Sequence, residues 1–173
     1  MFSLSRSSLL AVLFISMITQ PGFSQEVNQW IMDEDLGREV LLGDCDRNGL
    51  QSGEFAEPYL LNYMDYKPSE SVIRKLKKID VDYQILIVLA SWCGDSKRQL
   101  PAFMKLADLA GISDVISMIG VNRRKAIPGK NIDSLEIDRV PTFIIYRNSH
   151  EIGRIVESPS KSLEKDLLKI LQK

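Results

Sequence analysis

The feature that most constrains this chain is a cysteine placed between an apolar run and a helical pattern. Residues 85–90 form an unbroken apolar run, which is typical of a strand buried on both faces. Residues 97–110 space their apolar side chains as an amphipathic helix does. A buried strand followed directly by a helix predicts an α/β domain. The junction between them reads Trp92-Cys93-Gly94-Asp95-Ser96.

This position favours a reactive thiol at Cys93. Free backbone N–H groups and the positive end of the helix dipole stabilise a thiolate over a thiol, and the thiolate is the nucleophilic form. Asp95 opposes this effect because it brings a like charge, whereas Lys97 and Arg98 are cations that offset it. A lone cysteine is more often a small buried apolar residue, but the strand-to-helix position and Trp92 argue against that alternative. We therefore predict that Cys93 is catalytic.

Ser96 is the second predicted catalytic residue. It follows Cys93 by three residues, so the two side chains share one helical face. A hydroxyl there is able to donate a hydrogen bond to a thiolate, and the alternative is a residue that only starts the helix. Since a hydroxyl cannot attack a mixed disulfide, a resolving thiol is missing at this position.

The remainder of the chain predicts a mixed sheet covered by helices. Strands joined first through helices and then by a hairpin give that architecture. The predicted segments after the cysteine are a strand at 115–121, a loop-rich connection at 122–136, a hairpin of strands 142–147 and 151–157, and an amphipathic helix at 162–171.

Residues 25–70 are predicted to be an N-terminal, mainly helical extension to a domain at 71–173. Tyr59, Tyr63 and Tyr66 recur at helical spacing, and we expect them to pack on the core rather than form a substrate surface. The predicted segments are a partly helical stretch at 26–42, a loop at 43–53, a helix at 55–66, and a helix at 70–78 with Ser69 as its N-cap.

The cysteine motif and its surroundings resemble the thioredoxin superfamily. Pro101 lies eight residues after Cys93, where thioredoxins carry a helix-kinking proline. Val140-Pro141-Thr142 opens a second apolar strand, as the cis-proline strand does in that family. The resemblance covers residues 72–173 and implies the thioredoxin fold, with a mixed central sheet flanked by helices. The whole chain also resembles secreted Bacteroidetes-type thioredoxin-like proteins with the W-C-x-D-S form.

The resemblance implies a substrate-binding groove and a redox activity. Trp92, Val140 and a cis Pro141 would form the groove, with the backbone of Val140 free to pair with an extended substrate. Two residues depart from the family pattern, namely Ser96 in place of a second cysteine and Ile87 in place of a buried acid. We therefore expect monothiol thiol–disulfide exchange, with a redox-inactive binding or chaperone-like module as the alternative.

The first 24 residues have the pattern of a secretory signal peptide. Arg6 precedes an apolar stretch at 9–18, and Pro21, Gly22 and Ser24 follow. The stretch is too short to cross a bilayer comfortably, although a retained anchor is the alternative. We expect a periplasmic or secreted protein without membrane contact after cleavage. Its expected partners are extracytoplasmic proteins that carry thiols or disulfides.

Cys45, the other cysteine, leaves two interpretations open: a resolving thiol brought close in space, or a bystander. Around it, Asp44-x-Asp46-x-Asn48-Gly49 resembles the start of a calcium loop, but the twelfth position is Phe55 rather than an acid. The single histidine, His150, lies in a predicted turn. We therefore predict no metal site and no cofactor. A net charge of −1 gives no basic excess for nucleic acid.

Overall fold

The structure, a computed structural model, describes residues 26–173, so the predicted signal peptide at 1–24 lies outside the described residues. Its centre is a six-stranded sheet with the order β1-β2-β4-β3-β5-β6. The strands are β1 (Gln29–Asp33), β2 (Arg38–Cys45), β3 (Tyr83–Leu89), β4 (Ile116–Gly120), β5 (Thr142–Arg147) and β6 (His150–Val156). The helices are α1 (Arg47–Leu50), α2 (Ala56–Asp65), α3 (Glu70–Leu76), α4 (Gly94–Ala110) and α5 (Leu163–Leu171), and short 3₁₀ turns lie at Gly53–Phe55, Ser113–Val115 and Asp133–Leu135.

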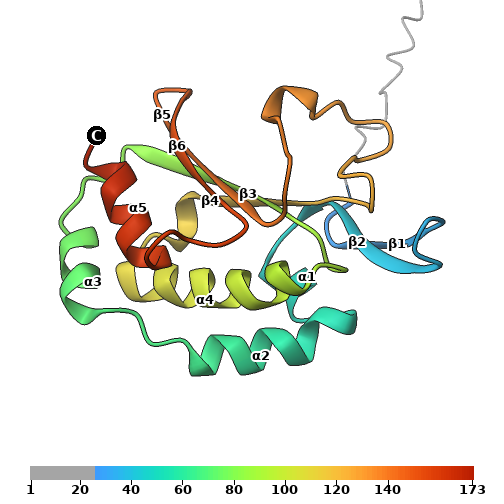
Figure 1. Cartoon of the computed structure of the whole chain (residues 1–173), viewed down its shortest axis with the longest axis horizontal. Coiled ribbons are helices and arrows are strands. Elements are labelled where there is room, and N and C mark those ends of the chain that lie inside the picture. Colours follow the sequence, from blue (N-terminus) through green and yellow to red (C-terminus); the bar gives the residue numbers. More distant parts are fainter. Residues whose placement is uncertain (1–25) are drawn as a thin grey trace, which may run out of the picture.

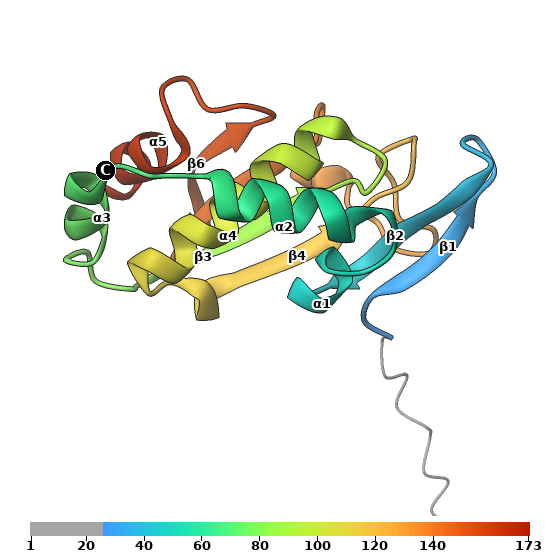
Figure 2. The same cartoon turned by 90° about the horizontal axis from the view of Figure 1, so that it is seen from below.

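The sheet is mixed, as predicted. β3 and β4 are parallel and are joined through α4, whereas the other neighbouring strands are antiparallel. Helices α2, α4 and α5 lie on one face of the sheet, and the connection between β4 and β5 lies on the other (Figures 1 and 2). The α/β architecture with a mixed central sheet and flanking helices is thereby confirmed.

Both faces of β3 are buried, which explains its unbroken apolar sequence. Ile85, Ile87 and Leu89 belong to the core that the helices cover. Val88 belongs to a second core on the opposite face, where the β4–β5 connection contributes Ile127 among others. A strand covered on both sides has no polar face, so its residues do not alternate.

The prediction of a partly helical segment at 26–42 is wrong, because this segment forms the β1–β2 hairpin. β2 pairs with β4 through contacts such as Gly43 with Gly120. A Cβ on Gly120 would lie 2.2 Å from the Leu41 carbonyl oxygen, so glycine permits the close approach of these strands. β2 thus pairs with β1 within the hairpin and also with β4 far along the chain, and local sequence pattern does not report the second pairing.

The predicted loop at 43–53 is also more ordered than expected. It contains the end of β2 and the short helix α1, whose N-cap is Asp46. The Asp46 carboxylate accepts hydrogen bonds from the backbone N–H groups of Asn48 and Gly49. In the calcium-like acidic run, Asp46 therefore acts as the N-cap of α1.

The helix predictions hold elsewhere. α2 and α3 lie within the predicted helices, with Ser69 at the N-cap of α3 and Tyr59 buried in the core. α4 begins after Cys93, contains Pro101, and ends at Gly111, whose φ of 75° is the left-handed C-cap conformation that glycine favours. These caps place the cysteine at the start of a 17-residue helix.

None of the helices within residues 26–173 combines the length and the apolar character needed to cross a bilayer.

Candidate active site

Cys93 lies where β3 turns into α4. Its backbone is extended, its N–H donates to the Ala90 carbonyl at 3.0 Å, and its own carbonyl accepts from the Lys97 N–H at 3.0 Å. The side chain is half-buried, and its thiol donates to the Val140 carbonyl oxygen at 3.3 Å. The sulfur is therefore both accessible and fixed, beside the first turn of α4 and the start of the β5 segment.

The Val140–Pro141 segment is held against the cysteine by sheet register. Val88 of β3 pairs with Thr142 of β5, which brings the start of β5 alongside the end of β3. Both Val140 and Pro141 are buried, and the peptide bond between them is cis. The Pro141 carbonyl accepts from the Glu157 N–H at 2.7 Å. The structure thus brings together Cys93, Val140 and Pro141, three of the predicted site residues.

Trp92 joins this group, because it packs with Cys93 against the core cluster that contains Val140. Its Nε1–H donates to the Val121 carbonyl at 3.2 Å, which attaches the ring to the connection that follows β4. The guanidinium of Arg123 lies over the ring, 4.9 Å from the centroid. Sequence reasoning missed Arg123, and no local signal links a cation to a tryptophan 31 positions earlier in the chain.

Ser96 follows Cys93 in the first turn of α4 but does not hydrogen-bond to the thiol. Its side chain is fully buried, and its Oγ accepts a hydrogen bond from the Ala90 N–H at 3.2 Å. Within residues 26–173 no hydrogen bond joins Ser96 to Cys93. The hydroxyl therefore stabilises the strand-to-helix turn, and any effect on the thiol acts through that turn.

The acid next to the cysteine is partly neutralised. The carboxylate of Asp95 forms an ion pair with Arg98, one turn further along α4. Both side chains are partly exposed, so the pairing weakens the local negative charge rather than removing it. This arrangement reduces the like-charge repulsion that Asp95 was expected to impose on a thiolate.

Cys45 is not brought to the active site. Both cysteines are free, and Cys45 pairs across the sheet with Met118, which in turn pairs with Ile87 of β3. Two strand spacings, roughly 10 Å, therefore separate Cys45 from Ile87, and Cys93 lies beyond the end of β3. A disulfide requires Cα atoms within about 7 Å.

The environment of Cys45 also disfavours its thiolate. The side chain is 7% exposed. Burial, together with the nearby charges of Asp44 and Asp46, raises the pKa of Cys45 to about 12. The structure therefore supports the bystander interpretation and gives no support to a resolving thiol at this position.

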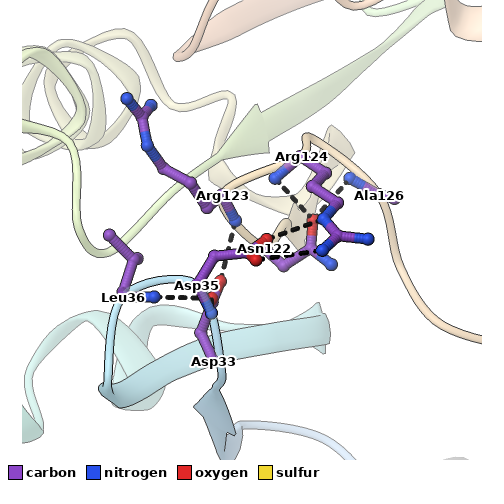
Figure 3. Close-up of polar contacts among 7 residues, drawn as sticks. All are labelled: Asp33, Asp35, Leu36, Asn122, Arg123, Arg124 and Ala126. Carbon is purple, nitrogen blue, oxygen red and sulfur yellow. Dashed lines mark hydrogen bonds and ion pairs between the residues drawn. The ribbon is translucent and has the colours of Figure 1, made fainter.

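A buried carboxylate, Asp33, fixes the turn of the β1–β2 hairpin to the segment beside Trp92 (Figure 3). Its Oδ1 accepts from the N–H groups of Asp35 and Leu36, at 2.9 and 3.1 Å. Its Oδ2 accepts from the N–H of Arg123 at 2.8 Å. One 7%-exposed side chain thus links the hairpin to the residue that covers the active-site tryptophan.

Further contacts reinforce this junction. Arg124 binds Asp35 with two hydrogen bonds of 2.7 and 2.9 Å. The Asn122 side-chain oxygen accepts from the N–H groups of Arg124 and Ala126, which closes the turn after β4. The 122–126 segment is therefore ordered by its own contacts and by the hairpin.

The described part of the chain contains no group of three or more histidine, cysteine, aspartate or glutamate side chains arranged to hold a metal ion. Of the acids in the calcium-like run, Asp46 caps α1 and Asp44 forms an ion pair with Lys130 at 2.9 Å.

Comparison with known proteins agrees with this geometry. The family model Thioredoxin_9, described as thioredoxin, matches residues 54–168, more than half of the chain. Thioredoxin H2-1 of Oryza sativa subsp. japonica is 32% identical over 83 residues, which are 45% of this chain and 53% of the rice protein. The chain thus spans about half the length of that relative. Thioredoxin H9 of Arabidopsis thaliana is 26% identical over 138 residues, covering 79% of this chain and 93% of the relative.

A solved structure, a protein of unknown function from Pseudomonas aeruginosa, has a TM-score of 0.50 and 18% identity, and the match covers 69% of this chain and 82% of the other. At that identity the likeness concerns the fold alone.

Proposed function

The chain belongs to the thioredoxin family, whose chemistry is thiol–disulfide redox exchange, and from this premise we propose that it is a monothiol member acting through Cys93. The proposal rests mainly on the position of the Cys93 sulfur and on the groups around it. This sulfur is accessible at the start of α4 and faces the Val140 carbonyl, whereas Ser96 occupies the position of a second thiol. Cys45, the remaining thiol, is buried two strands away.

The proposed step is a single thiol–disulfide exchange. The Cys93 thiolate attacks one sulfur of a partner disulfide, so that a bond forms between the two sulfurs while the original S–S bond breaks. The second partner sulfur leaves as a thiolate with the electron pair. The mixed disulfide at Cys93 is then resolved by a thiol that this chain does not supply, either from the partner or from a small molecule.

Residues around the sulfur have distinct roles in this proposal. Trp92, Val140 and Pro141 form the wall against which an extended partner segment docks. Ser96 holds the turn that presents the thiol, since its Oγ accepts from the Ala90 N–H. Ile87, fully buried where thioredoxins carry an acid, supplies no proton-transferring group.

We place this activity outside the cytoplasm. The support is the signal-peptide pattern of residues 1–24 and the likeness to secreted Bacteroidetes-type proteins with the W-C-x-D-S form. The proposed partners are extracytoplasmic proteins with thiols or disulfides, which such compartments contain in abundance.

Trapping of mixed disulfides tests the proposal. Cells expressing the full chain are quenched with acid and N-ethylmaleimide, and adducts are separated without reductant and identified by mass spectrometry. We expect adducts with extracytoplasmic proteins that disappear in Cys93→Ser and persist in Cys45→Ser. Adducts that survive Cys93→Ser, or that contain only cytoplasmic proteins, would contradict it.

A redox-inactive binding module is the second candidate. It is favoured by the absence of a second thiol at Ser96, because a module that only binds partners needs no resolving group. An insulin-reduction assay with an added small thiol separates the two candidates. Exchange at Cys93 predicts reduction faster than by the small thiol alone, with this acceleration lost in Cys93→Ser, whereas a binding module predicts no acceleration with either chain.

A further inference from the structure

Arg123 differs from the other arginines around the active site in having no acidic partner in the described part of the chain. It is exposed, and within residues 26–173 no carboxylate lies within ion-pair distance of its guanidinium. Its contact is with the ring of Trp92, at 4.9 Å from the centroid. The neighbouring arginines are all paired, as Arg98 with Asp95, Arg124 with Asp35, and Arg139 with Glu157.

The position of Arg123 is fixed from two sides. Its backbone N–H donates to the buried carboxylate of Asp33, and its side chain points away from that network (Figure 3). The ring beneath the guanidinium is held by the hydrogen bond from Trp92 to the Val121 carbonyl. The backbone of Arg123 and the ring beneath its guanidinium are therefore both held in place. A ligand that binds this guanidinium loses less side-chain entropy than one that binds a free surface arginine.

Within residues 26–173 the only hydrogen bond that Arg123 donates comes from its backbone N–H, so the N–H groups of its guanidinium are available to a ligand. These donors match the two oxygens of a carboxylate in a bidentate pair. Since Trp92 directly precedes Cys93, a carboxylate bound over its ring would lie near the partner sulfur that reacts with Cys93.

We infer that Arg123 is a specificity-determining residue, which selects protein partners with an aspartate or glutamate close in sequence to the reacting cysteine. This inference rests on the proposed exchange at Cys93. A lysine at the same place in the partner would face the unpaired guanidinium and be disfavoured.

The test uses peptides whose single cysteine carries 2-nitro-5-thiobenzoate as a mixed disulfide. Attack by Cys93 on the peptide sulfur forms the protein–peptide disulfide and releases coloured thionitrobenzoate. A glutamate, glutamine or lysine is moved through the positions on either side of the cysteine. Rates are measured for the full-length wild type, Arg123→Gln, Arg123→Glu and Arg74→Gln, an equal charge change on α3 at the opposite end of α4 (Figure 1).

We expect the wild type and Arg74→Gln to prefer the best-placed glutamate peptide over its lysine counterpart by roughly two- to fivefold. The preference should vanish in Arg123→Gln, reverse in Arg123→Glu, and shrink in high salt. Equal rates for all peptides, or a preference that persists in Arg123→Gln, would overturn the inference while leaving exchange at Cys93 intact. Absence of release that depends on Cys93 would overturn the proposed function itself.

Discussion

The two cysteines of this chain lie in the same sheet, yet their surroundings differ in almost every respect that governs thiol chemistry. Cys45 lies in β2, pairs with Met118 of β4, and packs in the helix-covered core. Cys93 lies past the last residue of β3, half-exposed, at the N-terminal end of α4. Residue type is identical in the two regions, so the fold decides which sulfur reacts.

The comparison also explains why Cys93 is expected to react with a partner disulfide without help from Cys45. A thiol inside a strand is kept neutral by its apolar neighbours, whereas a thiol at a strand-to-helix junction meets unpaired N–H groups and solvent. Sheet register keeps the two about two strand spacings apart or more. A mixed disulfide on Cys93 is therefore out of reach of Cys45.

The largest expected effect is in alkylation. With the pKa of Cys45 raised to about 12, its thiolate fraction at pH 7.5 is about a thousandfold below that of an ordinary thiol. Iodoacetamide should therefore modify Cys93 within minutes and leave Cys45 intact, as read by peptide mass spectrometry over time. Cys45 should stay protected up to about pH 9, because its deprotonation begins only as the pH approaches its raised pKa.

Denaturant provides the control for this experiment, since unfolding should make the two sulfurs equally reactive. Equal rates in the native protein would remove the distinction on which the monothiol account depends.

The next largest effect is on stability, at the junction between the β1–β2 hairpin and the segment that contains Arg123. Asp33→Ala removes the acceptor for three backbone N–H groups, those of Asp35, Leu36 and Arg123. We expect the free energy of unfolding to fall by roughly 1–3 kcal/mol. If the loosened hairpin opens locally, Cys45 at the end of its second strand, β2, should also alkylate faster.

Asp35→Ala is the matched control, because its ion pair with Arg124 is exposed and should contribute less than about 1 kcal/mol. Denaturant titration of both variants measures the difference. Equal losses in the two variants would show that Asp33 has no special role in fixing the junction.

A smaller effect is expected at Ser96. Ser96→Ala leaves the buried N–H of Ala90 without its acceptor, which should cost roughly 1–2 kcal/mol of stability. Because Ser96 makes no hydrogen bond to Cys93, the alkylation rate of Cys93 should change little as long as the protein stays folded. A large fall in that rate with stability unchanged would instead indicate a direct contact with the thiolate.

The sequence predicts those parts of the fold whose signals are local. The apolar run of β3, the periodicity of α4 and the glycine at its C-cap are each contained within a few turns of chain, and their predicted positions are confirmed. The β1–β2 hairpin is missed although its strands are adjacent in sequence, and the pairing of β2 with β4, more than 70 residues later, has no local signal. Local pattern there is compatible with helix, and tertiary pairing decides the outcome.

The candidate site divides in the same way. Cys93, Trp92, Val140 and Pro141 are identified by local motif, and the structure brings them together. The contact of Arg123 with Trp92 is missed because it joins distant segments. For Ser96, helical spacing places the side chain near the thiol, but the hydrogen bond to Ala90 directs its oxygen elsewhere.

The most direct test is the lifetime of a mixed disulfide on Cys93. Protein loaded at Cys93 with thionitrobenzoate is freed of excess reagent, and release of the coloured thiolate is followed without added thiol. Wild type and Cys45→Ser should both hold the adduct until a small thiol is added. Ser96→Cys should retain no adduct and should release the second equivalent of coloured thiolate already during loading, because the introduced thiol attacks the Cys93 sulfur and forms an internal disulfide. Rapid release by the wild type that is abolished in Cys45→Ser would contradict the account, since Cys45 would then be a resolving thiol.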